Sequence, residues 1–177
     1  REVSKEVRVE LGMSEITLAL ECGGSDPTSG IASNPSIGVA SNLLVDEGGS
    51  SILSETTEVI GAEHLLATSF EDEEMKDKFL KFVSDVEKRA IAMGEDLRSG
   101  QPTPGNKAGG LSTIEEKSLG CMYKAGNKPF KGALEYADIV PPDKKGLYFM
   151  DTPGQDIDSI TGMVAGGAQI VIFSTGR

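Results

Sequence analysis

The feature that most limits the fold is a series of four short apolar runs, each bounded by turn-forming residues. The runs occupy residues 16–20, 51–53, 147–150 and 169–173. Runs of this length are typical of β-strands that are buried on both faces of a parallel sheet. Stretches with helical character lie between them, so the sequence predicts an α/β protein.

Helices are expected between these strands, covering both faces of an open, mainly parallel sheet of the Rossmann-like kind. Asn and Pro at residues 34–35 suit a helix start, and two glycines at residues 48–49 suit its end. Residues 72–97 carry an apolar stripe at spacings of three and four, typical of a helix packed on a core. We also expect helices over 61–69, 112–124 and 156–166, and loops over 99–111 and 126–145.

The length of 177 residues fits one domain. Residues 1–14 show no firm pattern and are interpreted as a lead-in segment, followed by a single catalytic-core domain at 15–177. The last apolar run stands almost at the end of the chain, and a core strand makes a poor terminus. We therefore expect further polypeptide on both sides and a domain that is truncated at its C-terminus.

Composition narrows the choice of partners. A formal net charge of −11 argues against nucleic acid, whose phosphates need clustered Lys and Arg. No run of about 18 apolar residues is present, so no membrane-spanning helix is expected, and the polar N-terminus does not resemble a signal peptide. Two cysteines, Cys22 and Cys121, are too few for a disulfide scaffold. We expect a cytoplasmic protein with a small-molecule ligand; the oligomeric state stays open, a homo-oligomer included.

Small, polar or charged residues follow each of the four apolar runs, at positions 22–26, 54–58, 151–154 and 174–177. The carboxyl ends of parallel strands share one edge of a sheet, where ligands bind. Turn formation alone would explain the Gly, Ser, Asp and Pro in these segments, but not the Glu, Cys and Arg. The sequence therefore predicts that these segments converge on one polar crevice.

Candidate metal ligands lie in the first half of the chain. Carboxylates with one imidazole suit Mg, Mn or Fe(II). A Glu near a helix start is also favoured by the helix dipole, and a single His is usually structural, so both interpretations stay open. A cysteine before two glycines could ligate a metal beside backbone N–H groups, pack as a small residue, or act as a nucleophile with the single His as base. The candidate ligands are Cys22, Glu55, Glu58, Glu63 and His64.

Two lysines, Lys107 and Lys117, are candidates to bind a carboxylate or to move a proton.

Residues 151–154, Asp-Thr-Pro-Gly, also resemble the nucleotide switch of GTPases. A GTPase needs a Gly-x-x-x-x-Gly-Lys-Ser/Thr phosphate loop, and the sequence has none. The Gly-x-Gly-x-x-Gly fingerprint of nicotinamide enzymes is missing as well, so both classes are disfavoured.

Eight short motifs follow one another between residues 15 and 177. They are Cys22-Gly-Gly-Ser-Asp, Ser29-Gly-Ile with Asn34-Pro, Ser54-Glu-Thr, Gly61-Ala-Glu-His, Pro104-Gly-Asn-Lys with Gly109-Gly-Leu, Glu116-Lys-Ser-Leu-Gly, Met150-Asp-Thr-Pro-Gly and Thr175-Gly-Arg. In this order they resemble the altronate/galactarate dehydratase family, which includes the large subunit of sulfolactate sulfo-lyase. Thr28, Ser33 and Ser36 depart from the family pattern, which bears on the substrate more than on membership.

The resemblance implies a lyase that uses a divalent metal, Fe(II) or Mn(II), to dehydrate a sugar acid of the altronate or galactarate type to a 2-keto-3-deoxy acid. It also implies an N-terminal domain of the same polypeptide, or a small subunit. Elementary chemistry agrees, because loss of the proton α to a carboxylate creates negative charge that a cation or focused donors must stabilise. The alternatives are a carbon–sulfur lyase of the sulfolactate type, a non-catalytic sugar-acid-binding domain and a purely structural domain.

These expectations assign roles to particular residues. The expected catalytic residues are Lys107, Lys117, Glu55 and Asp151. The expected substrate-binding residues are Gly23, Gly24, Ser25, Asp26, Ser29, Asn106, Thr152, Thr175 and Arg177.

Overall fold

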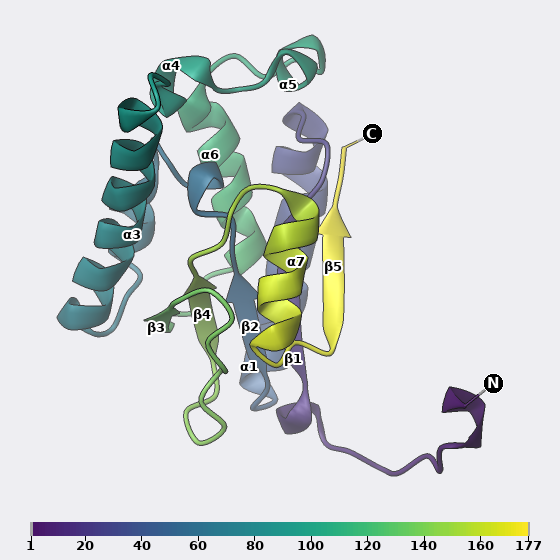
Figure 1. Ribbon diagram of the computed structural model, residues 1–177. Helices are drawn as coiled ribbons and strands as arrows, with labels where there is room; N and C mark the ends of the chain where they lie inside the picture. Colours follow the sequence, from purple (N-terminus) through teal and green to yellow (C-terminus); the bar gives the residue numbers. More distant parts are fainter. Residues whose placement is uncertain (1, 177) are drawn as a thin grey trace.

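A computed structural model of the protein describes residues 2–176. Its centre is a five-stranded sheet in which every neighbouring pair is parallel, with the strand order β3-β4-β2-β1-β5 (Figure 1). The strands are β1 (Thr17–Cys22), β2 (Ser50–Leu53), β3 (Phe130–Leu134), β4 (Leu147–Met150) and β5 (Ile170–Ser174). The predicted α/β class with an open parallel sheet is confirmed.

Strand β3 lies inside residues 126–145, which the sequence analysis assigned to a loop, and that assignment is wrong for these five residues. Lys131 and Gly132 interrupt the apolar pattern, so no local signal marks the strand. Tertiary packing stabilises it instead. The ring of Phe130 stacks on that of Phe70 with centroids 4.8 Å apart, and Ala133 and Leu134 are buried.

The helices agree with the prediction in position and differ in their ends. The bounds are α1 (Asn34–Asp46), α2 (Glu63–Ala67), α3 (Glu73–Ala92), α4 (Leu97–Gly100), α5 (Pro104–Ala108), α6 (Ile114–Met122) and α7 (Asp156–Ala165). Helix α3 stops before the predicted end at residue 97, because Gly94 adopts a φ of +86° that continues no helix. The predicted loop 99–111 contains the short helix α5, which Thr103 caps with its hydroxyl.

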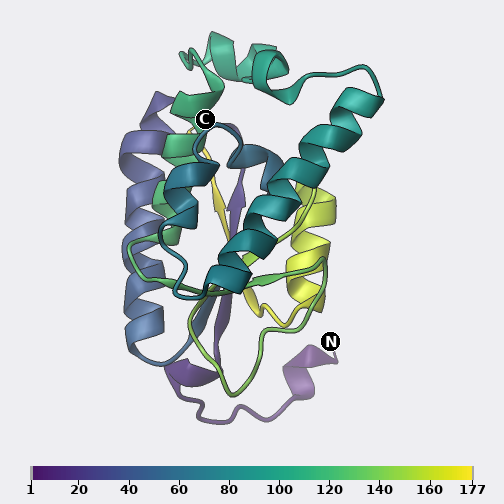
Figure 2. The same ribbon diagram turned by 90° about the vertical axis from the view of Figure 1, so that its left-hand side faces the viewer.

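Helices cover both faces of the sheet, as predicted, but unequally. Helices α1, α3 and α6 pack on the face to which Leu20 and Leu53 point, and this larger core includes the ring of Phe79. Helix α7 covers the opposite face, where Met163 packs with Ile52. Figure 2 shows α1 and α7 on opposite sides of the strands.

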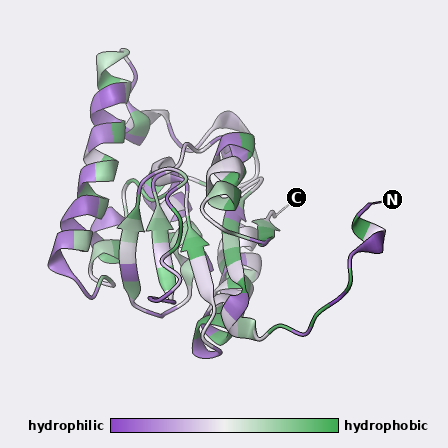
Figure 3. Cartoon of the chain, turned by 60° about the horizontal axis from the view of Figure 1, so that its bottom comes forward, coloured by the Kyte–Doolittle hydropathy of each residue, from purple (hydrophilic) through white to green (hydrophobic). Residues whose placement is uncertain are grey.

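Residues 2–12 extend away from this body, as the N-terminal segment in Figure 3 shows. Each of them is exposed, and Val3 and Val7 are both 85% exposed. Among residues 2–176, no helix has the length and apolar character needed to cross a membrane.

Parallel pairing places the carboxyl ends of all five strands at one edge of the sheet. From this edge, the chain leaves β2 toward the face covered by α3 and α6, whereas it leaves β4 toward the face covered by α7. Strands β2 and β4 are neighbours in the sheet. Adjacent strands whose connections diverge leave a crevice between them, and this is where open α/β sheets bind ligands.

Candidate active site

A cavity of about 390 Å³ lies at this edge. The segments after β1, β2 and β4 all contribute to its wall, together with residues from the 101–106 segment and from α6. Its lining residues are Cys22, Gly23, Glu55, Thr57, Glu58, Gln101, Thr103, Asn106, Lys117, Gly154, Gln155 and Asp156. Three of the four segments predicted to converge therefore do so around one polar cavity.

Glu55 has an unusual backbone conformation directly after β2. Its φ of +66° and ψ of +73° lie in the left-handed region, which costs a residue other than glycine about 1–3 kcal/mol. Two hydrogen bonds hold it there. The Glu55 N–H donates to the Thr152 hydroxyl at 2.8 Å, and the Glu55 carbonyl accepts from the Glu58 N–H at 2.8 Å. Backbone strain of this kind is found preferentially at functional sites.

The Glu55 carboxylate faces a buried ammonium group. Its Oε2 accepts a hydrogen bond from the Cys22 N–H at 2.8 Å and lies 3.3 Å from Lys124 Nζ. The Lys124 side chain is 0% exposed. Burial raises the pKa of Glu55 to about 8, although Lys124 favours the charged form. Glu55 therefore holds a proton for much of the time at neutral pH.

Lys124 stays charged inside the protein. Burial opposes its charge, but the neighbouring carboxyl groups of Glu55 and Glu58, when ionised, attract the proton and leave the pKa of Lys124 well above its usual value. This permanent cation stabilises the ionised form of each acid beside it, Glu21 included.

Glu21, at the end of β1, is a second buried acid in the same cluster. Its Oε2 accepts from the Ser159 hydroxyl at 2.7 Å, while its Oε1 has no hydrogen-bond partner within residues 2–176. Burial raises the pKa of Glu21 to about 7, and the hydrogen bond from Ser159 and the charge of Lys124 partly offset that rise. Glu21, Glu55 and Lys124 thus form a buried centre that can store and release a proton near neutral pH.

A second acid–amine pair reaches into the cavity from another direction. Glu58 Oε1 lies 2.9 Å from Lys117 Nζ, and the two side chains are only 11% and 8% exposed. The other oxygen, Glu58 Oε2, is buried without a hydrogen-bond partner among the described residues. An unpaired carboxylate oxygen next to a fixed cation can accept a proton, or a hydrogen bond from a ligand hydroxyl. The cation can at the same time stabilise negative charge on the ligand.

The four predicted catalytic residues occupy different places. Glu55 and Lys117 line the cavity. Lys107 is exposed on α5, and it is not among the lining residues. Asp151 lines a neighbouring cavity, where its Oδ1 accepts from the Thr56 hydroxyl at 2.5 Å. The catalytic roles themselves stay predictions.

The glycines after β1 have a structural reason that the sequence analysis did not foresee. The Gly23 N–H donates to the Ser174 carbonyl at 2.6 Å, so it is not available to an anion, contrary to expectation. A Cβ at Gly23 would come within 2.3 Å of the Phe173 ring, so close packing against β5 requires glycine. Gly24 lies beside Thr175, whose hydroxyl a Cβ would meet at 3.4 Å.

Three other predicted binding residues line a neighbouring groove of about 280 Å³ beside α6, which shares Lys117 with the cavity. They are Ser25, Asp26 and Ser29. Asp26 organises the turn after β1, because its Oδ1 accepts from the Ser29 N–H at 2.8 Å. The Ser25 carbonyl accepts from the Asn106 side chain at 3.0 Å, and this bond fixes the α5 segment over the cavity.

The remaining predicted binding residues are dispersed. Thr152 is buried and holds the Glu55 backbone through its hydroxyl. Thr175 is exposed after β5. Arg177 lies outside the described residues.

The five candidate metal ligands do not meet. Cys22, Glu55 and Glu58 line the cavity, but Glu63 Oε1 pairs with Arg98 at 2.6 Å on the far side of α2, and His64 is exposed. Within residues 2–176, no three His, Cys, Asp or Glu side chains form a group that could hold a metal ion. The arrangement therefore does not fit a metal held by this chain alone, and a divalent metal stays a prediction.

The two thiols are free and buried. Cys22 Sγ lies 2.9 Å from the Ser25 hydroxyl, and burial raises its pKa to about 11. Burial likewise raises the pKa of Cys121. A neutral thiol is a poor nucleophile, so this geometry disfavours covalent cysteine catalysis.

Sequence reasoning missed Glu21 and Lys124, although both leave a signal. Glu21 is a charged residue that directly follows an apolar strand and precedes Cys22. Lys124 follows Ile114, Ser118 and Cys121 on the buried side of the α6 segment. A charge on an otherwise buried face needs a partner, and that requirement indicates a polar centre inside the protein.

The fold and the cavity define a class: an open α/β domain with paired acids and amines at the carboxyl edge of its sheet. Residues 13–177 match the family described as D-galactarate/altronate dehydratase, C-terminal, and the chain belongs to this family. It is 41% identical over 170 residues to altronate dehydratase of Bacillus subtilis and 37% identical over 164 residues to galactarate dehydratase (L-threo-forming) of Escherichia coli. It is 34% identical over 170 residues to (2R)-sulfolactate sulfo-lyase subunit beta of Chromohalobacter salexigens.

These alignments cover 96%, 93% and 93% of this chain, respectively. They cover 34% and 31% of the two dehydratases and 42% of the sulfo-lyase subunit. The chain thus spans about a third of the length of the dehydratases that it resembles.

Proposed function

We propose that this chain forms part of a hydro-lyase that dehydrates a sugar acid of the altronate or galactarate type to a 2-keto-3-deoxy acid. One observation carries the proposal: a single cavity is lined by Glu58 with its unpaired oxygen, by Lys117 with its ammonium group and by Glu55 with its pKa of about 8. Such a site can remove one proton and supply another, as dehydration requires.

Proton removal is assigned to Glu58. Its unpaired Oε2 takes the proton from the carbon next to the substrate carboxylate. The bonding electrons move into the carboxylate, which gains a second negative charge. Lys117, 2.9 Å from the other Glu58 oxygen, stabilises that charge as it develops.

Proton donation is assigned to Glu55. The bond between the adjacent carbon and its hydroxyl breaks, and the protonated Glu55 carboxyl gives its proton to the departing oxygen, which leaves as water. The resulting enol acid then tautomerises to the keto acid. Lys124 stabilises the Glu55 carboxylate that remains, and Glu21, a neighbouring buried acid with a pKa of about 7, is the proposed source of the next proton.

The metal and the rest of the assembly are separate predictions. Fe(II) or Mn(II) would need ligands besides those that residues 2–176 bring together. The dehydratases compared above are about three times as long as this chain, which supports the expectation of an N-terminal domain or a small subunit beside it.

A carbon–sulfur lyase is the second candidate, supported by the similarity to the sulfolactate sulfo-lyase subunit. The same proton removal next to a carboxylate would then expel sulfite from the neighbouring carbon in place of water. The difference lies in the leaving group, so product analysis separates the two candidates.

The intact protein should be assayed for keto-acid formation from several aldonates and aldarates, and for sulfite release from sulfolactate, with and without Fe(II) or Mn(II). Keto-acid formation that Glu58→Gln abolishes supports the hydro-lyase. Sulfite release would favour the second candidate. Tight sugar-acid binding without turnover under any condition would instead indicate a non-catalytic binding domain.

A further inference from the structure

A chain of hydrogen bonds inside the protein joins the backbone of Glu55 to the carboxyl group of Glu21. The Glu55 N–H donates to the Thr152 hydroxyl at 2.8 Å, and Thr152 Oγ1 lies 3.0 Å from the Ser159 hydroxyl. The Ser159 hydroxyl in turn donates to Glu21 Oε2 at 2.7 Å. All four residues are buried, so the two acids are linked by a path of hydroxyl groups that lies away from solvent.

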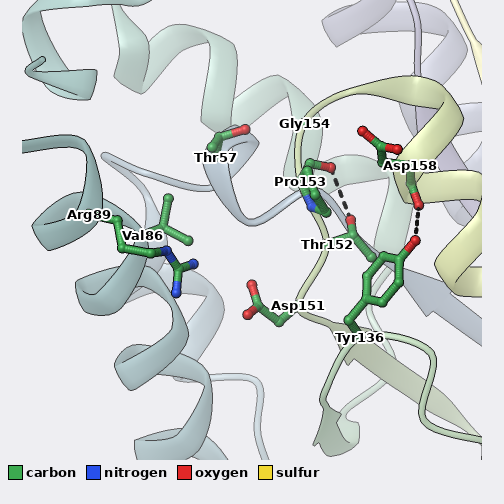
Figure 4. A pocket seen from close by; sticks show the side chains of 9 residues that line it. All are labelled: Thr57, Val86, Arg89, Tyr136, Asp151, Thr152, Pro153, Gly154 and Asp158. Atoms are coloured by element: carbon green, nitrogen blue, oxygen red, sulfur yellow. Dashed lines mark hydrogen bonds between the residues drawn. The ribbon is translucent and has the colours of Figure 1, made fainter. Parts of the chain in front are cut away.

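Thr152 turns inward where its neighbour turns outward. Figure 4 shows the Asp151 carboxylate turned toward Arg89, across a cavity of about 580 Å³, and the Thr152 side chain on the other side of the segment. Consecutive residues at a strand end alternate in this way. The Thr152 side chain is 2% exposed, and its hydroxyl reaches Ser159 on α7. Thr152 is therefore placed to hold other parts of the protein.

The single hydrogen of the Thr152 hydroxyl has two possible acceptors. Ser159 Oγ lies 3.0 Å away, and the Pro153 carbonyl lies 3.2 Å away, as the dashed line in Figure 4 marks. An ionised carboxylate only accepts hydrogen bonds, so ionised Glu21 takes the Ser159 hydrogen, and the Ser159 oxygen accepts from Thr152. Protonated Glu21 removes this requirement, because it can donate to Ser159, and the Thr152 hydrogen can then turn to Pro153.

The charge of Glu21 therefore decides the direction of the chain. With Glu21 ionised, every bond runs from the Glu55 N–H toward the Glu21 carboxylate, and bonds aligned in this way polarise and strengthen one another. The bond at the far end is one of those that hold Glu55 in its left-handed conformation. Because the chain begins at a backbone N–H, it transmits orientation rather than a proton.

We propose that Thr152 and Ser159 are positioning residues, through which the charge of Glu21 controls how firmly the Glu55 carboxyl group is held. This inference rests on the proposed function and deepens it, because it adds regulation to the same site. After Glu55 has given its proton to the departing hydroxyl, Glu21 passes a proton to Glu55 and becomes ionised. The chain then tightens and holds the reprotonated Glu55 in place for the next turnover.

The direct test is an NMR pH titration of the intact protein that follows the backbone amide of residue 55. It is made in Glu55→Gln, so that the carboxyl group of this residue does not contribute to the shift. Lys124 and Asp156 also face Glu21, and they are retained throughout. The amide proton signal should move with the midpoint of the Glu21 carboxyl titration, which ¹³C labelling follows separately.

Adding Ser159→Ala should remove most of that movement, because only the effect of the Glu21 charge through space is left. The matched control is Thr161→Val, which removes a hydroxyl of the same helix that donates to the Ile157 carbonyl and should leave the movement unchanged. Equal movement with and without the Ser159 hydroxyl would overturn the proposal.

Turnover gives a second readout. Thr152→Val keeps the shape of the side chain but cannot accept the Glu55 N–H, so kcat should fall by about 10- to 100-fold while KM changes less than about threefold. Thr152→Ser retains the hydroxyl and should recover most of kcat. Wild-type kcat in Thr152→Val would contradict the positioning role. A wild type without any turnover refutes the proposed function, and the titration then still decides whether the chain links the two acids.

Discussion

Two carboxylate–cation clusters in this molecule show how burial changes the meaning of the same charges. In the buried cluster, the Glu55 and Lys124 side chains are 2% and 0% exposed. In the surface cluster, Glu63 and Arg98 are 17% and 45% exposed, and Arg98 also pairs with Glu87 at 2.6 Å. Water screens the surface pairs, which are worth about 0–1 kcal/mol each. The buried cluster has no such screening, so its acids keep protons near neutral pH and can do chemistry.

The largest contrast is expected in catalysis. Glu55→Gln removes the proposed proton donor of the buried cluster but keeps the shape of the side chain, so kcat should fall by about 10²- to 10⁴-fold. Glu63→Gln, the matched change in the surface cluster, should alter kcat less than about twofold. Steady-state keto-acid assays on both variants check this prediction, and similar losses in the two would remove the distinction between the clusters.

Stability should show the next largest contrast. Lys124→Met leaves the buried acids without their cation, and at about pH 9, where both acids are ionised in the wild type, it should lower the free energy of unfolding by about 3–5 kcal/mol. Arg98→Gln should lower it by no more than about 1 kcal/mol. Urea denaturation of both variants provides the measurement. A Lys124→Met protein as stable as the wild type at about pH 9 would contradict the role of Lys124 as the cation that stabilises the ionised acids.

A smaller effect is expected in the pH dependence of stability. The folded-state pKa values of Glu21 and Glu55, about 7 and about 8, lie above the ordinary value of 4.5. The folded state therefore binds more protons than the unfolded state between pH 4.5 and about 8, and stability falls as the pH rises through this window. Each group contributes at most about 1.4 kcal/mol per pH unit.

Denaturation curves between pH 5 and pH 9 test that slope, with Glu21→Gln as the informative variant because it should flatten the dependence. The surface variant Glu63→Gln should retain the wild-type slope. If stability instead rose steadily over this range, the assignment of raised pKa values to the buried acids would be contradicted.

The sequence was sufficient for most of the sheet and for the location of the cavity. Continuous apolar runs identify β1, β2, β4 and β5, and parallel strands necessarily bring their carboxyl ends to one edge. Glu55 and Glu58 could be predicted as site residues because they directly follow β2. Strand β3 escaped detection, since Lys131 and Gly132 break its pattern and its burial depends on contacts far away in the sequence.

The errors within the site have a common physical origin. Glu63 and His64 are close to Glu58 in sequence, but the chain turns at Gly61, whose φ is +100°, and α2 directs them away from the cavity. Lys124 lies 69 residues from Glu55 and meets it only because the turn after α6, Tyr123–Ala125, packs against β2. Proximity along the chain was therefore a poor guide to ligand sets, whereas position relative to a strand end was a good one.

The proposed function requires a sugar acid to bind in the cavity between the ends of β2 and β4. The most direct measurement is an NMR titration of the protein with galactarate, which follows backbone amides on both sides of the sheet edge. Binding in this cavity should produce saturable shifts at Thr57, Glu58 and Gly154, with little change at His64. Shifts that are confined to the region around His64, or that spare the three cavity residues at saturation, would contradict it.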